Sequence, residues 1–211
     1  MGNGEIKDHA KLKTMIISSC RENTLIISAD GGLHNTLKLG FKPDIIIGDM
    51  DSISLQEMTG YGEDFSGTEL ISASLEKDES DTRLAVEHAA WMGIEDIIIT
   101  GATGGRLDHT FANIMLLASP GLDGVAIRIL TETSEIFSSD KSCTIKGVPG
   151  KLISIFSLTP CTTFVRTEGL KYELKDEKLY LSPVRGLSNN FTADKALLDF
   201  KDGRLLIIKE L

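Results

Sequence analysis

The stretch IIIGDMDS, residues 45–52, joins a run of apolar residues to two carboxylates. Successive isoleucines are typical of a strand buried on both faces, as in a parallel sheet covered by helices. Gly48 would let the backbone pass close to a neighbour. Asp49 and Asp51 are two residues apart, so their side chains would project to the same side of an extended chain. The stretch therefore predicts a buried strand that ends in a pair of acids.

Similar short apolar runs occur along the first part of the chain and alternate with helical patterns. The other predicted strands are TLIISA (24–29), ELISAS (69–74), DIIIT (96–100) and VAIRIL (125–130). Helices are predicted over 81–93 and 107–118, where apolar residues recur at helical spacing. Strands that alternate with helices indicate an α/β architecture. We therefore expect residues 1–134 to form an α/β domain with a mostly parallel sheet flanked by helices.

The helical period disappears after about residue 135. The remaining sequence consists of short β-rich runs such as KLISIFSL and ALLDFKDGRLLIIKE. We expect a small all-β, sandwich-like domain over residues 135–211. Hairpin turns are predicted at 175–177 and 201–203, and the linker between the domains at 131–140.

Composition narrows the classes of function. The chain has 211 residues, 41% of them hydrophobic, and a net charge of -9. This balance is typical of a soluble globular protein and argues against binding to long nucleic acid, which needs a basic surface. No apolar run reaches the ~18 residues of a membrane span. The three cysteines are odd in number and widely spaced, so a reducing cytoplasm is expected.

Polar residues follow four of the predicted strands. The carboxyl ends of parallel strands share one edge of a sheet, where ligands of open α/β folds bind. The residues in question are Asp30, Gly31, Gly32, Asp49, Asp51, Lys77, Asp78, Asp81, Thr103, Gly104, Gly105, Arg106, Asp108 and His109. We expect them to converge on one cleft.

The chemistry of this set points to a metal ion and a phosphate. Crowded carboxylates raise one another's pKa unless a cation lies between them, and ligand sets made only of oxygen suit Mg²⁺. GATGGR, residues 101–106, precedes a predicted helix whose N-terminal N–H groups would favour an anion. Arg106 could add a bidentate phosphate contact.

Each of these features also has a simpler interpretation. A DxD pair such as Asp49 and Asp51 is common in loops. Asp81 could be only the N-cap of the following helix. Gly104 and Gly105 could form nothing more than a tight turn, and His109 could be a helix-face residue without a ligand. The metal and phosphate hypothesis depends on all these features lying at the same edge of the sheet.

Several longer motifs carry a family resemblance. SADGG, PDIIIGDMDSI, KDESDTRLA and GATGGRLDHTFANI, followed by GLKYEL and GLSNNF, resemble in order and spacing the motifs of thiamine pyrophosphokinases. The resemblance implies a homodimeric, Mg²⁺-dependent enzyme that transfers pyrophosphate from ATP to thiamine, giving thiamine diphosphate and AMP. It also implies a nucleotide-binding α/β domain, a β-sandwich domain that helps to bind thiamine and to dimerise, and a thiamine site between the subunits.

The resemblance also assigns roles to residues. Asp49, Asp51 and Asp81 would hold Mg²⁺ on the triphosphate, and Asp30 would lie beside them. The substrates would be bound by a larger set: Gly31, Gly32, Lys77, Asp78, Thr103, Gly104, Gly105, Arg106, Asp108, His109 and Asn113, with Ser188 and Asn189 near the thiamine ring. Asp30, Asp49, Asp51, Asp81 and Arg106 would be the catalytic group.

The chain departs from the family pattern in two places. KDESD stands where KDxTD is usual, and serine retains the hydroxyl group. The segment MGNGEI stands where similar proteins have an apolar strand immediately upstream. A parallel sheet without that strand would expose an edge. We therefore expect reduced stability or a compensating dimer contact, and a melting temperature that changes when about ten upstream residues are restored.

The expected reaction begins with attack of the thiamine hydroxyl on the β-phosphorus of ATP. Such transfers need positioning and charge neutralisation more than covalent help. Asp81 or Asp30 would accept the hydroxyl proton, and Arg106 or Lys77 would stabilise the leaving side. Two other functions remain open at this stage. One is a nucleotide-binding or thiamine-binding protein without turnover, and the other is a Mg²⁺-dependent DxD transferase that uses nucleotide-sugars.

Overall fold

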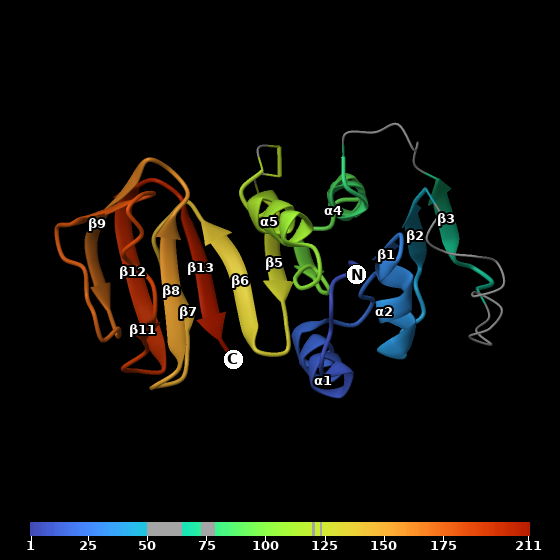
Figure 1. The fold of residues 1–211 in the computed structure, drawn as a ribbon, viewed down its shortest axis with the longest axis horizontal. Helices are drawn as coiled ribbons and strands as arrows, with labels where there is room; N and C mark the ends of the chain where they lie inside the picture. Colours follow the sequence, from blue (N-terminus) through green and yellow to red (C-terminus); the bar gives the residue numbers. More distant parts are fainter. Residues whose placement is uncertain (50–64, 73–78, 120, 123) are drawn as a thin grey trace. The chain divides into compact units, whose positions relative to one another are not determined.

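The structure is a computed structural model that describes residues 1–49, 65–72, 79–119, 121–122 and 124–211 (Figure 1). The chain divides into two compact units, Met1–Glu132 and Thr133–Leu211. The expected boundary was at residue 134. None of the helices in the described ranges is both long and apolar enough to cross a membrane.

Strands and helices alternate along the first unit. The elements are α1 (His9–Ser19), β1 (Ile27–Ala29), α2 (Gly32–Lys38), β2 (Ile45–Gly48), β3 (Glu69–Ser72), α4 (Asp81–Trp91), β4 (Asp96–Ile99), α5 (Leu107–Leu116) and β5 (Ala126–Leu130). Both predicted helices are confirmed. β2 pairs with β1 and β3, and β4 pairs with β5, all in parallel. The described strands of this unit thus form two groups of parallel strands, β1 to β3 and β4 with β5. The expected single, mostly parallel sheet is therefore seen only in part.

The apolar run of β2 is buried because helices cover both of its faces. Ile45 and Ile47 pack with Ala29 of β1 and Ala85 of α4. Ile46 points the other way and packs with Leu33 of α2. A strand that is covered on both faces needs apolar residues at every position, which explains why its sequence is continuously apolar instead of alternating. Burial on two faces fixes the position of the strand end, where the acids follow.

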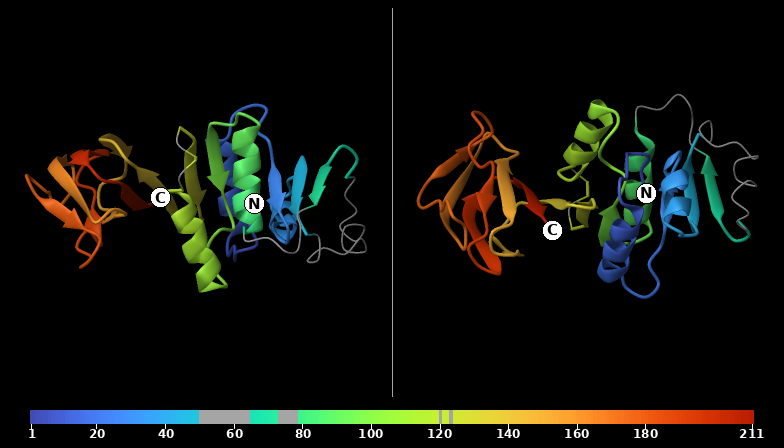
Figure 2. Two further views of the ribbon diagram at one scale, coloured as in Figure 1. Left: turned by 90° about the horizontal axis from the view of Figure 1, so that it is seen from above. Right: turned by 60° about the horizontal axis from the view of Figure 1, so that its bottom comes forward.

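The second unit consists of two antiparallel sheets. Their strands are β6 (Ser134–Ser139), β7 (Cys143–Lys146), β8 (Leu152–Ser157), β9 (Cys161–Glu168), β10 (Lys178–Tyr180), β11 (Asn189–Asn190), β12 (Lys195–Asp202) and β13 (Leu205–Glu210). One sheet has the order β10-β9-β12-β7, and the other includes β11-β8-β13-β6. Figure 2 shows the strands of this unit, in yellow to red, from two further sides. Ile155 and Ile207 of one sheet and Phe164 and Leu198 of the other belong to one core cluster. The two sheets therefore pack face to face, as a sandwich does.

Three predictions about this unit were wrong. The expected linker at 131–140 contains β6, which pairs along its length with β13. Residues 201–203 are not a hairpin turn, because they join β12 to β13 and these strands belong to different sheets. Residues 175–177 lie beside β9 instead of forming a turn, since Asp176 N–H donates to the carbonyl of Val165 at 3.0 Å. In each case pairing with a distant strand outweighed the local turn composition.

Candidate active site

Asp30 ends β1 in an unusual conformation. Its φ angle is 42°, in the left-handed region that few non-glycine residues adopt. Its backbone N–H donates to the carbonyl of Ile47 at 2.7 Å, which ties it to β2. Its carboxylate Oδ1 is buried and has no hydrogen-bond partner among the described residues. A buried carboxylate oxygen is costly unless something pairs with it, so this position suits a cation.

Gly48 brings the end of β2 against Asp30. A Cβ atom at position 48 would lie 2.7 Å from the Cβ atom of Asp30, so no larger residue fits without a shift of the backbone. Asp49 follows directly and is half-buried. The structure therefore places Asp30 and Asp49 at neighbouring strand ends. Asp51, the second acid of the predicted pair, lies outside the described residues.

Asp81 is the first residue of α4 but not its N-cap. That role belongs to Ser80, whose hydroxyl accepts from the Arg83 N–H at 3.3 Å, so the simpler interpretation of Asp81 was wrong. Asp81 lies four residues before Ala85, on the helix face that packs on Ala29 and Ile47. A carboxylate in the first turn is also stabilised by the helix dipole. Lys77 and Asp78 lie outside the described residues.

The glycine-rich loop before α5 is held in place by Asn113. Its side-chain Nδ2 is buried and donates to the carbonyl of Ala102 at 2.9 Å. Thr103 follows and is half-buried. Gly104 and Gly105 have φ angles of 85° and 65°, and no atom lies within 4 Å of a Cβ atom built on Gly105. Asn113 thus fixes a loop whose exposed backbone a ligand could approach.

Arg106 and Asp108 form an exposed ion pair where α5 begins. Arg106 Nη2 and Asp108 Oδ2 are 2.6 Å apart, and Nε donates to Oδ1 at 3.2 Å. The hydrogen bond from Arg106 lowers the pKa of Asp108 to about 2. His109 is exposed, and its backbone N–H donates to the same carboxylate at 3.0 Å. The pair holds a guanidinium group in the solvent beside the helix N-terminus, where an anion could meet it.

The N-terminal segment is part of this region, which the sequence patterns missed. Gly2 N–H donates to the Thr100 carbonyl at 2.7 Å, and Gly4 N–H donates to the Gly101 carbonyl at 2.6 Å. Asn35 of α2 donates to the carbonyls of Gly2 and Gly4. The segment therefore links the strand end of the DGG motif to the GATGG loop. The alternating glycines of MGNG were the available signal.

Gly31 and Gly32 pack against this same segment. A Cβ atom on Gly31 would lie 2.5 Å from Asn3 Nδ2, and one on Gly32 would lie 2.1 Å from the Met1 carbonyl oxygen. The close approach that these glycines permit is thus to the chain itself. Their contact with a ligand stays a prediction.

Ser188 and Asn189 belong to the second unit. Ser188 is exposed with a φ angle of 57°, and its N–H donates to Ser154 Oγ at 3.1 Å. The buried Asn189 side chain accepts from the Tyr172 N–H at 2.9 Å and donates to the Tyr172 carbonyl at 2.8 Å. Asn189 therefore positions the loop around Tyr172, and Ser188 presents its side chain to solvent.

Both units match models of known families. The model described as "Thiamin pyrophosphokinase, catalytic domain" matches residues 18–129. The model described as "Thiamin pyrophosphokinase, vitamin B1 binding domain" matches residues 139–205. A curated relative, thiamine pyrophosphokinase of Bacillus subtilis (strain 168), is 29% identical over 190 residues, which cover 89% of this chain and 88% of the relative.

Solved structures agree with these matches. The crystal structure of thiamine pyrophosphokinase from Bacillus subtilis has a TM-score of 0.85 and 25% identity, and the match covers 99% of this chain and 96% of that one. The thiamin pyrophosphokinase family protein from Enterococcus faecalis has a TM-score of 0.78 and 26% identity, with 100% of this chain and 96% of that chain covered.

Proposed function

Because the chain belongs to the thiamin pyrophosphokinase family, we propose that it transfers the pyrophosphoryl group of ATP to thiamine, giving thiamine diphosphate and AMP. The observation that carries this proposal is that the two domain models match in order and cover both units. The fold alone would not suffice, because one fold hosts many activities.

The acids at the strand ends fit Mg²⁺. They offer oxygen ligands only, and Asp30 Oδ1 is buried with no partner among the described residues. Asp49, Asp51 and Asp81 would hold the ion, with Asp30 beside them. When bound, Mg²⁺ would neutralise charge on the phosphate oxygens of ATP.

The chain's own groups would orient the reactants and move one proton. The oxygen of the thiamine hydroxyl attacks the β-phosphorus, and the bond from that phosphorus to the oxygen that bridges it to the α-phosphorus breaks. AMP leaves with the bridging oxygen. Asp30 and Asp81 are the candidates for accepting the hydroxyl proton, and Arg106 or Lys77 for stabilising the charge on the leaving AMP.

The ATP side of the site would use the loop before α5. Thr103, Gly104 and Gly105 offer exposed or half-exposed backbone, and Arg106, Asp108 and His109 are exposed around the helix N-terminus. Breaking the exposed Arg106–Asp108 pair costs little, since ion pairs on the surface contribute little to stability. Arg106 could therefore exchange Asp108 for a phosphate group.

The second unit would contribute to thiamine binding and to a homodimer, with thiamine between the subunits. Leu181, Val184 and Leu187, in the segment before Ser188, are 54%, 58% and 63% exposed. An apolar group of this kind is typical of a surface that another molecule covers. Light scattering on the purified protein tests the dimer, and a monomeric mass would exclude an intersubunit site. The three free cysteines support a cytoplasmic location.

Product analysis tests the proposed function. The protein is incubated with ATP, Mg²⁺ and thiamine, and the products are followed by ³¹P NMR. AMP and thiamine diphosphate are expected. Binding of both substrates without turnover would favour a sensor, and ADP would indicate simple phosphoryl transfer. Turnover of a nucleotide-sugar instead of ATP would favour the DxD transferase.

A further inference from the structure

Asn3 is the one residue of the segment 2–4 that has room for a side chain. A Cβ atom on Gly2 would lie 2.6 Å from the Gly101 carbonyl oxygen, and one on Gly4 would lie 2.3 Å from the Thr103 carbonyl oxygen. Neither glycine can therefore be replaced without a shift of the backbone. Asn3, which stands between them, is exposed.

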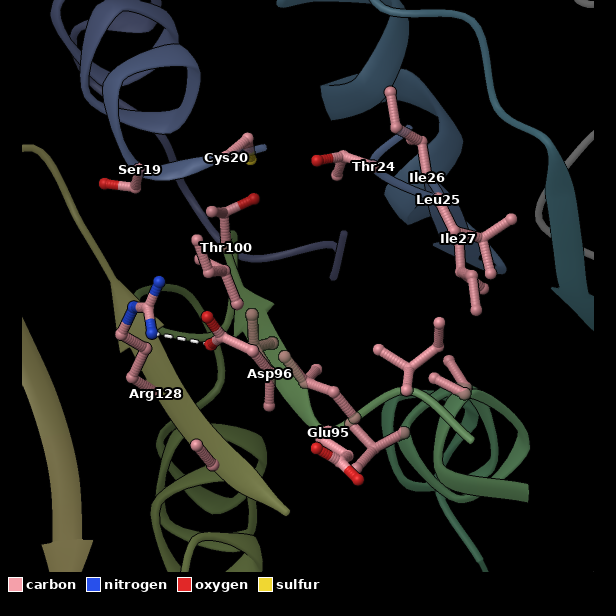
Figure 3. Close-up of a pocket in the computed structure, with 18 of the residues that line it drawn as sticks. Ser19, Cys20, Thr24, Leu25, Ile26, Ile27, Glu95, Asp96, Thr100 and Arg128 are labelled. Atoms are coloured by element: carbon pink, nitrogen blue, oxygen red, sulfur yellow. Dashed lines mark hydrogen bonds and ion pairs between the residues drawn. The ribbon is translucent and has the colours of Figure 1, made fainter. Parts of the chain in front are cut away.

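Hydrogen bonds fix the backbone on either side of Asn3. Both neighbouring glycines donate their N–H groups to carbonyls that follow β4, at 2.7 and 2.6 Å. The buried Asn35 of α2 donates to the carbonyls of the same two glycines, at 2.8 and 2.9 Å. Figure 3 shows Thr100, which accepts the first of these bonds, across a cavity from Ile27 of β1. A side chain on a backbone held in this way loses little freedom when a ligand binds it.

The Asn3 amide lies against the turn that follows β1. A Cβ atom on Gly31 would lie 2.5 Å from Asn3 Nδ2 and 2.8 Å from Asn3 Cγ, so glycine at position 31 makes room for the amide. Gly31 directly follows Asp30. The amide makes no hydrogen bond within the part of the chain that the structure describes. An unused amide group therefore lies beside the candidate site, between the DGG turn and the GATGG loop.

The acids nearby indicate which ligand the amide suits. An ionised carboxylate only accepts hydrogen bonds, so Asp30 and Asp49 can hold a phosphate group only through a cation. The Asn3 amide is neutral and carries two N–H donors, which can bond to a phosphate oxygen directly. The ends of β1 and β2 thus combine ligands for a cation with a donor for an anion, and a triphosphate that carries Mg²⁺ needs both.

We propose that Asn3 binds ATP, with its side-chain NH₂ group donating a hydrogen bond to an oxygen of the triphosphate. This role rests on the proposed function, in which ATP is a substrate. It adds a side chain of the N-terminal segment to the acids and to the glycine-rich loop before α5.

Steady-state kinetics of Asn3→Asp and Asn3→Ala test this role. Asn3→Asp keeps the shape of the side chain but replaces the donor by a negative charge, so the KM for ATP should rise roughly a hundredfold. Asn3→Ala only removes the donor and should raise the KM for ATP roughly tenfold. Turnover at saturating ATP and the KM for thiamine should stay within about twofold, because the lost contact serves the binding of ATP alone.

Asn23→Asp is the matched control. Asn23 is also exposed, but it precedes β1 and so lies at the end of the strand opposite to Asp30. The substitution changes the net charge by the same amount as Asn3→Asp. It should leave the KM for ATP unchanged, and an equal rise in Asn23→Asp would trace the effect to net charge and overturn the proposal.

Titration calorimetry with Mg²⁺ and α,β-methylene-ATP measures binding without turnover, because a carbon bridge replaces the oxygen between the α- and β-phosphorus atoms. Asn3→Asp and Asn3→Ala should bind this analogue more weakly than the unaltered protein does. Equal binding by all three would overturn the proposal. Tighter binding by Asn3→Asp would also overturn it, since residue 3 would then be a ligand of Mg²⁺. If the unaltered protein binds the analogue but forms no AMP from ATP, the proposed function fails, and weaker binding by both variants would still support the contact with Asn3.

Discussion

The Asp30 side chain lies so close to Gly48 that a Cβ atom at position 48 would be 2.7 Å from the Asp30 Cβ and 3.0 Å from its Cα. The ends of β1 and β2 are thereby in contact where the acids follow. We expect Gly48→Ala to displace Asp30 and Asp49, and to lower turnover by about a hundredfold, since catalytic groups tolerate little displacement. Steady-state kinetics measure this.

Gly93→Ala is the matched control for Gly48→Ala. Gly93 has a φ angle of 84°, and no atom lies within 4 Å of an added Cβ atom. This change should cost about 1–2 kcal/mol of stability through backbone strain and leave turnover unchanged. If both variants lost the same activity, the contact between Gly48 and Asp30 would not position the site.

Asp30→Asn tests the buried carboxylate directly. It removes a negative charge at an oxygen that has no partner among the described residues, so the fold should tolerate it. Turnover should fall by roughly a hundredfold. Asp44→Asn, at the other end of β2, should stay within about twofold, because an amide oxygen can still accept from Ile26 N–H. Similar rates for the two variants would remove Asp30 from the site.

Asn113→Ala should loosen the loop before α5. The Ala102 carbonyl would lose its donor, and an unpaired buried group costs about 1–3 kcal/mol. We expect a lower free energy of unfolding in urea and a raised KM for ATP, with a smaller effect on the KM for thiamine. Thr14→Ala, which removes an exposed hydroxyl that donates to the Ala10 carbonyl on α1, away from this loop, is the control. An unchanged KM for ATP in Asn113→Ala would separate this loop from nucleotide binding.

The buried Met1 ammonium group predicts a pH dependence of stability. Burial lowers its pKa from 8.0 to about 6. Between these values the unfolded chain binds more protons than the folded one, so the free energy of unfolding should rise with pH. The destabilisation is full below pH 6 and absent above pH 8, a difference of about 3 kcal/mol. Urea unfolding at both values measures it, and N-terminal acetylation should abolish this part of the difference.

Much of the first unit could be predicted because its signals are local. The three isoleucines buried under α2 and α4 form one apolar run in the sequence, and apolar residues recur at helical spacing along α4 and α5. α1 was not predicted, because only Leu12 and Ile16 on it are buried. In the second unit, 201–203 has the composition of a hairpin turn, but the strands it joins pair with partners far along the chain. Such long-range pairing cannot be recognised from the local sequence.

The candidate site could likewise be predicted only where local sequence patterns determine it. Asp30 and Asp49 could be placed at neighbouring strand ends, because parallel topology determines which strand ends meet. The role of MGNG could not, since its alternating glycines do not indicate that Gly2 and Gly4 bond to residues 100 and 101. The position of Asn113 in the family motif suggested a ligand contact, which stays a prediction, but it gave no sign of the hydrogen bond from its amide to the Ala102 carbonyl. Hydrogen bonds between residues far apart in the sequence thus show how these residues are held, which sequence spacing does not indicate.

The most direct test of pyrophosphoryl transfer follows the outer phosphorus atoms of ATP. The enzyme is incubated with thiamine, Mg²⁺ and ATP labelled with ³²P in either the β or the γ position, and the products are separated by chromatography. We predict that both labels move to thiamine diphosphate in equal amounts and that AMP remains unlabelled. Transfer of the γ label alone, with the β label left in ADP, would contradict the account.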